Sequence, residues 1–215
     1  MNDQIRLILA SQSPRRQELL DAMGLAGRYE VVPSGFEETL DDARTPAEVS
    51  QELGYGKALW VAERNPGAWV IGSDTIISAE GKQLGKATSE DHAREMLQLM
   101  AGATCEITSS AVLLHVTFTP ENSRVIKHYI GSDSAVIYFK PFNQAALDRY
   151  IQTGKWQDKA AAYGIQHDDG LLTEAISGEY GTILGIPTRL LADFLRQIGV
   201  RAHPANLTPP VPVKD

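Results

Sequence analysis

The sequence predicts an α/β fold, with a mixed, twisted sheet and helices flanking it. Short apolar runs typical of buried strands alternate with segments that begin at helix-capping residues and end at glycine or proline. Two long β-rich stretches, residues 104–117 and 125–139, are joined by a polar turn near Pro120 and predict one long hairpin. Because hairpin strands pair antiparallel while strands separated by helices pair parallel, a mixed sheet is expected.

The expected elements follow in order along the chain. Strands are predicted at residues 7–10, 30–33, 68–71 and 75–78, and helices at residues 14–23, 46–65, 89–101, 143–153 and 188–198. The first helix has Ser13 as its N-cap and Pro14 at its first position. The second helix opens with a capping box formed by Thr45 and Glu48.

The composition is that of a folded globular chain. Of the 215 residues, 43% are hydrophobic and 22% are charged, which excludes a disordered or collagen-like chain. This length favours one domain. Residues 1–203 are therefore expected to form a single α/β domain, and the proline-rich residues 204–215 an extended, mobile tail.

Charge and cysteine content exclude several classes of protein. The net charge of −7 argues against a nucleic-acid partner bound through broad phosphate neutralisation. The N-terminus lacks a signal-peptide core, and the apolar stretches fall far short of the ~20 residues of a membrane span. We therefore expect no membrane partner and a cytoplasmic protein. The lone cysteine, Cys105, excludes an intramolecular disulfide and fits a reducing compartment.

The sequence lacks the common nucleotide-binding motifs. Gly-Lys occurs four times, but Ser or Thr never follows it, so there is no Walker A loop. No G-x-G-x-x-G follows the first strand, and the histidines lack the H-E-x-x-H spacing of a zinc site.

Two arginines, Arg15 and Arg16, fall in the first turn of the first predicted helix. The helix dipole disfavours cations there by a few tenths to about 1 kcal/mol each. Together with the hydroxyls of Ser11 and Ser13 and free backbone N–H groups, they would form an anion site. The alternative is a pair of solvated arginines on an exposed helix.

Lys57 and Asp74 are also unusual. Lys57 shares a helical stripe with core-facing residues, so it either runs along the edge of the buried face to solvent or points into a cleft to meet a phosphate. Asp74 follows a buried strand, where α/β proteins bind ligands; it either holds a cation or water, or is a turn residue. The neighbouring Gly54 and Gly56 predict close packing or a kink in the helix that carries Lys57.

Several other polar residues look unremarkable when each is taken singly. They have the pattern of solvated surface positions: Glu37, Glu38, Lys86, Lys159 and Gln166.

Three separated motifs change that interpretation. S-Q-S-P-R-R-Q-E-L-L begins at Ser11, G-S-D-T-I-I at Gly72 and D-K-A-A-A-Y-G-I-Q at Asp158. In this order and spacing they resemble the Maf family of nucleoside triphosphate pyrophosphatases, over residues 7–198. G-S-D-T together with Y-G-I-Q resembles the branch of the family that acts on dTTP and UTP.

The resemblance implies roles for individual residues. Asp74 would be the catalytic carboxylate and, with Glu38, would hold a divalent metal, Mg²⁺ or Mn²⁺. Residues tied to substrate selection would be Arg15, Thr75 and Gln166. Residues lining the phosphate-binding cleft would be Ser11, Arg16, Lys57, Lys86 and Lys159.

The resemblance also implies an architecture and a reaction. The fold would have two lobes around a cleft, usually as a homodimer. The substrate would be dTTP, UTP or a modified pyrimidine nucleotide, hydrolysed to the monophosphate and pyrophosphate, as house-cleaning or pool regulation. Scattered cations converging on one acid suit that reaction, since the charge of a triphosphate must be cancelled before water can attack it.

Three departures from the family pattern leave an alternative open. Gly85 stands where the family usually has a glutamate that could help to hold metal, and Ala161 replaces a usual glycine. Gly54 and Gly56 replace larger residues in the helix that carries Lys57. The alternative function is a nucleotide-binding regulatory protein, related to cell division, with weak or no catalysis.

Overall fold

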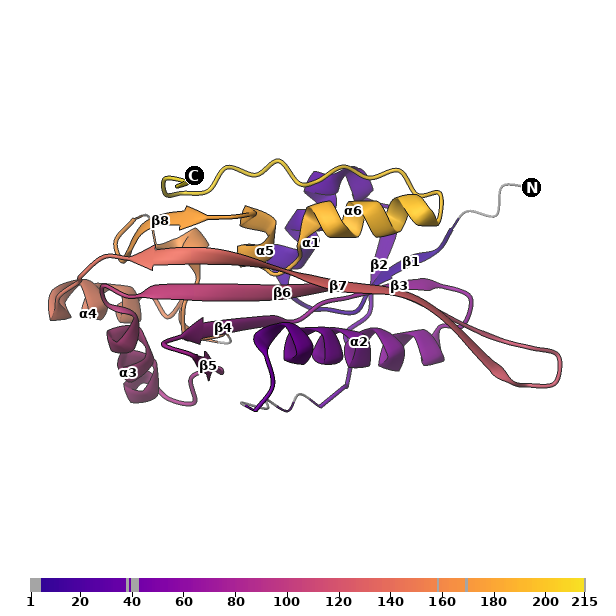
Figure 1. Ribbon diagram of the computed structural model, residues 1–215, viewed down its shortest axis with the longest axis horizontal. Helices are drawn as coiled ribbons and strands as arrows, with labels where there is room; N and C mark the ends of the chain where they lie inside the picture. The colour runs from indigo at the N-terminus through magenta and orange to yellow at the C-terminus, as the bar shows by residue number, and fades with distance from the viewer. Residues whose placement is uncertain (1–4, 38, 40–42, 158, 169, 215) are drawn as a thin grey trace.

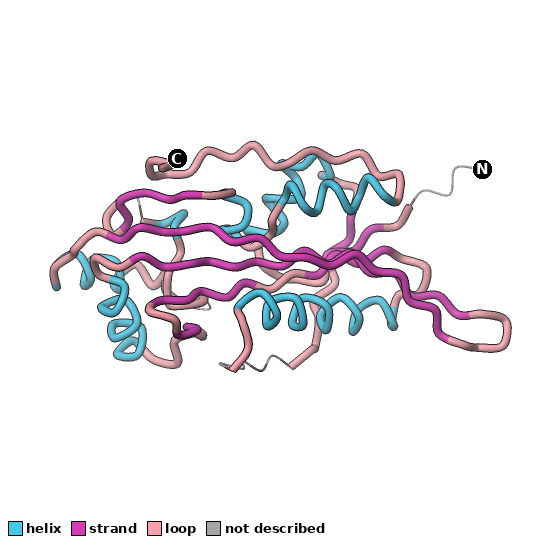
Figure 2. The backbone as a smooth tube through the Cα atoms, viewed as in Figure 1, coloured by secondary structure: helices cyan, strands magenta, loops and turns pink. Residues whose placement is uncertain are grey.

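The computed structural model describes residues 5–37, 39, 43–157, 159–168 and 170–214 (Figures 1 and 2). Its strands are β1 (Leu7–Leu9), β2 (Tyr29–Val31), β3 (Trp69–Gly72), β4 (Thr75–Ala79), β5 (Lys82–Leu84), β6 (Thr104–Phe118), β7 (Arg124–Phe139) and β8 (Thr173–Ser177). Its helices are α1 (Pro14–Leu20), η1 (Asp21–Leu25), α2 (Pro46–Arg64), α3 (Glu90–Met100), α4 (Gln144–Gln152), η2 (Ile165–His167), α5 (Tyr180–Leu184) and α6 (Thr188–Gln197).

One mixed sheet organises these elements, which confirms the predicted α/β class. Six strands follow the order β2-β1-β3-β6-β4-β5, and β7 adds to β6 and carries β8. β1 is parallel to β2 and β3, whereas all pairs of β6 and β7 are antiparallel. The predicted long hairpin is β6–β7, which runs through the length of the molecule in Figure 2.

The strand β6 joins the two ends of the sheet. Its C-terminal half pairs with β3, where Gly72 lies opposite Val112, and its N-terminal half pairs with β4, where Thr75 lies opposite Ser109. β3 and β4 pair with β6 in the same register. They therefore form one interrupted strand along β6, with the break at Ser73-Asp74. At this break a side chain can point away from the sheet.

Helices cover the two faces of the sheet. In Figure 1, α2 lies along one face, and α1 and α6 lie on the other. The alternation of strand side chains explains this division. Ile8 of β1 packs in the cluster of α2, whereas its neighbours Leu7 and Leu9 pack in the larger cluster that includes Leu19 of α1.

The helix α2 approaches the sheet through glycines. A Cβ atom on Gly72 of β3 would overlap the carbonyl oxygen of Gly54, and a Cβ on Gly54 would lie 2.5 Å from Ser110 Oγ. Gly56 likewise makes room for the ring of Phe36. Of the two explanations offered by the sequence for these glycines, the structure supports close packing.

The helix starts follow the sequence closely. The capping box at Thr45 is formed, with its hydroxyl accepting from the backbone N–H of Glu48 at 3.3 Å and the Glu48 carboxylate accepting from the N–H of Thr45 at 2.9 Å. Ser89 caps α3 and Asn143 caps α4, each at the first residue of a predicted helix. Cys105 is fully buried, and burial raises the pKa of its thiol to about 11.

The C-terminal segment differs from the prediction of a mobile tail. It crosses the molecule in an extended form and ends beside β8 (Figure 1). The Ile176 N–H donates to Pro212 O at 2.9 Å, the Lys214 N–H donates to Ile176 O at 2.7 Å, and Val211 is buried. The prolines of the segment favour an extended backbone, and its backbone hydrogen bonds attach it to β8.

Several short elements were not predicted from the sequence, among them β8 and α5. β8 forms through its pairing with β7, and α5 ends at Gly185, whose φ is 116°. Each has five residues, too few to show a periodic pattern. Among the described residues, no helix has the length and apolar character of a membrane span.

Replacing Gly72 with alanine tests the contact between α2 and β3. The added methyl overlaps a backbone oxygen that cannot rotate away, so we expect Gly72→Ala to lower the free energy of unfolding by about 1–3 kcal/mol. Gly131→Ala in β7 is the matched control, because the tightest contact of its new Cβ is with the flexible end of Leu190, at 3.0 Å. Urea unfolding would compare the two variants. Equal losses in the free energy of unfolding would argue that the backbone of Gly54 does not limit the space at Gly72.

Candidate active site

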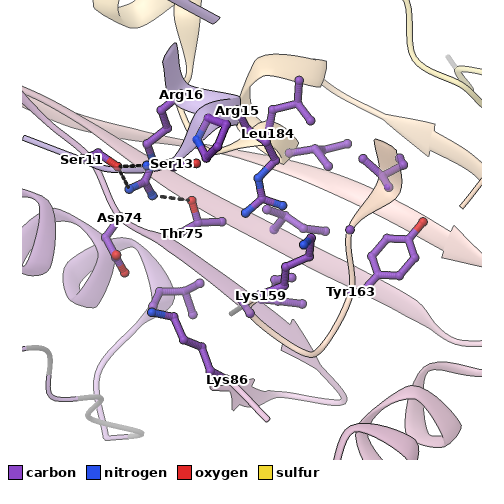
Figure 3. Close-up of a pocket in the computed structure, with 18 of the residues that line it drawn as sticks. Ser11, Ser13, Arg15, Arg16, Asp74, Thr75, Lys86, Lys159, Tyr163 and Leu184 are labelled. Atoms are coloured by element: carbon purple, nitrogen blue, oxygen red, sulfur yellow. Dashed lines mark hydrogen bonds between the residues drawn. The ribbon is translucent and has the colours of Figure 1, made fainter. Parts of the chain in front are cut away.

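A cavity of about 1080 Å³ opens where the sheet is interrupted. Its lining comes from several separate parts of the chain, which include residues 10–16 with Glu18, Lys57, residues 74–77, residues 84–86, and residues 159–160 and 163–167. These segments come from both ends of the sheet, so the cavity lies between the part that holds β1 and the part that holds β4 and β5. Figure 3 shows Arg15, Arg16, Asp74, Lys86 and Lys159 around one space.

Asp74 sits at the interruption between β3 and β4. Its backbone stays in the sheet, because the Ser110 N–H donates to Asp74 O at 2.9 Å. Its own N–H donates to Ser110 Oγ at 3.0 Å. The preceding Ser73 donates through its hydroxyl to Gly185 O at 2.5 Å. These bonds fix the backbone on both sides of the carboxylate, which therefore enters the cavity from a rigid support.

Lys57 of α2 forms an ion pair with Asp74. Its Nζ contacts Asp74 Oδ1, and each residue is only 7% exposed. The lysine therefore points into the cleft, as the functional alternative predicted, and does not run out to solvent. Asp74 Oδ2 has no hydrogen-bond partner among the described residues. One oxygen of the carboxylate is thus held by the protein, while the other is available to a ligand.

The two arginines of α1 differ in their contacts. Arg16 donates from Nε to Gly185 O at 3.1 Å, from Nη1 to Ser11 Oγ at 3.3 Å, and from Nη2 to Thr75 Oγ1 at 3.3 Å. Figure 3 shows the bonds to Ser11 and Thr75. Arg16 therefore connects three segments that line the cavity, and it orients the loop after β1 against β4.

Arg15 makes no hydrogen bond or ion pair within the described residues. Burial lowers the pKa of its guanidinium, and the charge of neighbouring Arg16 lowers it further. The group nevertheless stays protonated at neutral pH, because the ordinary pKa of arginine lies far above it. A partly desolvated cation beside another cation is unfavourable in isolation. An anion in the cavity would relieve both costs.

Lys86 and Lys159 approach the cavity from the side opposite Arg15 and Arg16 (Figure 3). An isolated bridge between Lys86 and Ala160 brings their two loops together, and the Ala161 N–H donates to Gly85 O at 2.8 Å. Neither lysine could be assigned to a cleft from its own surroundings in the sequence. The pairing of the two loops places them there.

Part of the cavity lining is apolar. Its apolar lining is supplied by Ile77, Leu84, Ile107, Ile137, Ile183 and Leu184. Gln166 lines this cavity too, and its Nε2 donates to Glu18 Oε2 at 2.9 Å. Glu18, Ile183 and Leu184 were not among the predicted site residues. Glu18 follows Arg15 by three positions on one helix, which is the only local signal that could have indicated it.

The comparisons with known proteins agree on one family. A family model described as "Maf-like protein" matches residues 6–198. The chain belongs to the Maf family. A "dTTP/UTP pyrophosphatase" from Bacillus pumilus (strain SAFR-032) is 38% identical over 91% of this chain and 97% of its own length. A "dTTP/UTP pyrophosphatase" from Pyrococcus horikoshii is 34% identical, over 88% and 95% respectively.

A solved structure of a HAM1 protein from Coxiella burnetii also matches this Maf chain. The match has a TM-score of 0.42 and 14% sequence identity, and covers 90% of this chain and 99% of that one. At this TM-score the likeness supports no conclusion about function.

A divalent cation, which the Maf resemblance implies, fits the donors around Asp74. Mg²⁺ in proteins is commonly bound by one or two carboxylates together with substrate phosphates and water. Asp74 Oδ2 can be one such ligand. Glu38, the second expected ligand, lies outside the described residues. Within the part of the chain that the structure describes, no three His, Cys, Asp or Glu side chains gather as a metal site.

The departure of Ala161 from the Maf signature has a visible consequence. Its φ is 52°, and that of Ala162 is 56°, so both residues adopt the left-handed conformation that favours glycine. An alanine there costs about 1–2 kcal/mol. The loop that carries Lys159 and Gln166 is therefore strained at the position where a glycine is usual.

Ala161→Gly should relieve this strain. We expect the free energy of unfolding to rise by up to about 1 kcal/mol, since the relief is partly offset by the greater freedom of glycine in the unfolded chain. The matched control is Ala160→Gly, at a neighbouring position without a positive φ, which should destabilise the protein. Thermal or urea unfolding measures both. Destabilisation by both substitutions would contradict the strain.

Proposed function

We propose that this protein is a nucleoside triphosphate pyrophosphatase that hydrolyses UTP and dTTP to the monophosphate and pyrophosphate. The arrangement of charge in the cavity carries the proposal. The carboxylate of Asp74 enters a space bordered by five cations: Arg15, Arg16, Lys57, Lys86 and Lys159. A second carboxylate, that of Glu18, also lines this space. The names of the relatives from Bacillus pumilus and Pyrococcus horikoshii support the same activity and substrates.

The cations suit the first requirement of the reaction. A triphosphate carries several negative charges, which repel an attacking water unless they are neutralised. The partly buried guanidinium of Arg15 and the ammonium groups of Lys86 and Lys159 would meet the phosphates. Because these groups are placed before the substrate binds, they stabilise the developing charge without reorganisation.

Asp74 suits the second requirement of the reaction, which is to activate the attacking water. A water oxygen forms a new bond to the α-phosphorus, the bond from that phosphorus to the bridging oxygen breaks, and pyrophosphate leaves. The water loses a proton, and Asp74 Oδ2 is the carboxylate oxygen placed to orient the water or accept that proton. Lys57 holds the other oxygen of the carboxylate and so fixes its direction.

A divalent metal, Mg²⁺ or Mn²⁺, belongs to the proposal. When bound, it would neutralise phosphate charge and polarise the phosphoryl group. Asp74 would hold it, and Glu38 is the second expected ligand. Gly85 supplies no carboxylate, so the protein offers few ligands of its own. Phosphate oxygens would complete the coordination, and metal affinity should therefore be low without nucleotide.

Assembly and location are further parts of the proposal. The family resemblance supports a homodimer, which size-exclusion chromatography with light scattering would test. The buried lone thiol of Cys105 supports a reducing compartment such as the cytoplasm.

Asp74→Asn tests the catalytic carboxylate. The amide keeps the shape and still accepts from Lys57, so the fold should survive, but turnover should fall by at least about 100-fold. Pyrophosphate release from UTP with Mg²⁺ or Mn²⁺ measures it, and Asp193→Asn, an exposed change on α6, is the control. Unchanged turnover would remove Asp74 from the mechanism. Nucleotide binding without product by the unaltered protein would favour the regulatory alternative.

Arg15→Gln and Arg16→Gln should have different effects. Arg15 makes no protein hydrogen bond within the described residues, so its substitution should leave stability within about 0.5 kcal/mol and lower kcat/KM for UTP by about tenfold or more. Arg16 connects Ser11, Thr75 and Gly185, so its substitution should lower the free energy of unfolding by about 1–3 kcal/mol. Unfolding curves and UTP kinetics on both variants would separate substrate binding by Arg15 from structural support by Arg16. Equal losses in stability would contradict this assignment.

A further inference from the structure

Glu18 makes a contact whose purpose the proposed reaction does not explain. Its Oε2 accepts from Gln166 Nε2 at 2.9 Å, and both residues line the cavity. They are 148 positions apart in the sequence, one on α1 and the other in η2. Glu18 is exposed, and no ion pair of its carboxylate is found among the described residues. The contact thus lies at the cavity wall and not in the core.

A glutamine amide can adopt two orientations with nearly the same shape. Rotation of the terminal torsion by about 180° exchanges its oxygen with its NH₂ group. The two orientations match opposite partners. Uracil and thymine present an N3–H donor between two carbonyl oxygens, whereas cytosine presents an N3 acceptor beside an amino group. A freely rotating amide could therefore bind either kind of base.

The carboxylate of Glu18 removes this freedom. An ionised carboxylate only accepts hydrogen bonds, so it holds the NH₂ group of Gln166 and would repel Oε1 in the flipped orientation. Hydrogen bonds to a charged acceptor are about twice as strong as neutral ones. Gln166 Oε1 has no partner among the described residues. In the held orientation, Oε1 faces away from Glu18 and is left to a ligand as an acceptor, while one N–H of the amide is committed to the carboxylate.

We propose that Glu18 is a positioning residue for base selection, which locks the amide of Gln166 so that Oε1 accepts from the N3–H of uracil or thymine. Cytosine would place its N3 lone pair against the same oxygen and is rejected. The inference rests on the proposed function, since it needs a pyrimidine nucleotide in the cavity. It gives Glu18 a role in selectivity and none in the chemical step.

Glu18→Gln is the informative substitution. The new amide can donate or accept toward Gln166, so both orientations of Gln166 become available while the contact is kept. We expect the ratio of kcat/KM for UTP to that for CTP to fall about tenfold. The affinity ratio for UMP over CMP, measured by calorimetry, should fall in parallel. Glu95→Gln, an exposed charge removal on α3, is the matched control and should leave both ratios unchanged.

A double-mutant cycle separates positioning from a general structural effect. If Glu18 acts through Gln166, Glu18→Gln should not change the UTP:CTP ratio in a Gln166→Ala background. An unchanged ratio in the single Glu18→Gln variant, or equal losses for UTP and CTP, would overturn the role of Glu18 while leaving the proposed hydrolase intact. Absence of UTP hydrolysis by the unaltered protein would overturn the proposed function, and this inference with it.

Discussion

The close approach of α2 to the sheet is the constraint on which the site depends. Gly72 in β3 and Gly54 in α2 bring two backbones together at a distance that no larger residue allows. Three residues after Gly54, Lys57 emerges on the same side of the helix and meets the carboxylate of Asp74, two residues after Gly72. The buried ion pair is therefore a consequence of backbone packing. A helix held farther away by side chains would leave both charges buried and unpaired, which is strongly unfavourable.

The continuous register along β6 gives the Asp74 carboxylate its rigidity. Most side chains that enter a ligand cavity come from loops after a strand, which are mobile. Asp74 instead interrupts a strand that resumes in the same register, with backbone bonds to Ser110 on β6. The position of its carboxylate is consequently set by the sheet, and not by a loop.

The cations of the cavity differ in whether they have protein partners. Lys57 and Arg16 already have protein partners, and they orient Asp74 and the segments around it. Arg15 has no hydrogen-bond partner within the described residues and carries the cost of burial, which a bound anion would offset. An acidic protein can thus hold a polyphosphate, since the relevant positive charge is local and the net charge of −7 belongs to the surface as a whole.

The sequence alone determined most of the elements and the residue types of the site. Caps such as Thr45 and Ser89, the apolar strands and the long hairpin are encoded by neighbours a few positions apart, so local patterns revealed them. It did not reveal β8 and α5, which are too short to show a period and depend on contacts with distant strands. Only the tertiary structure decided which of two adjacent arginines bonds to the surrounding protein, which oxygen of Asp74 is held by Lys57, and that Glu18 contacts Gln166. Those outcomes depend on side chains brought together across the sheet, and no local preference specifies such a meeting.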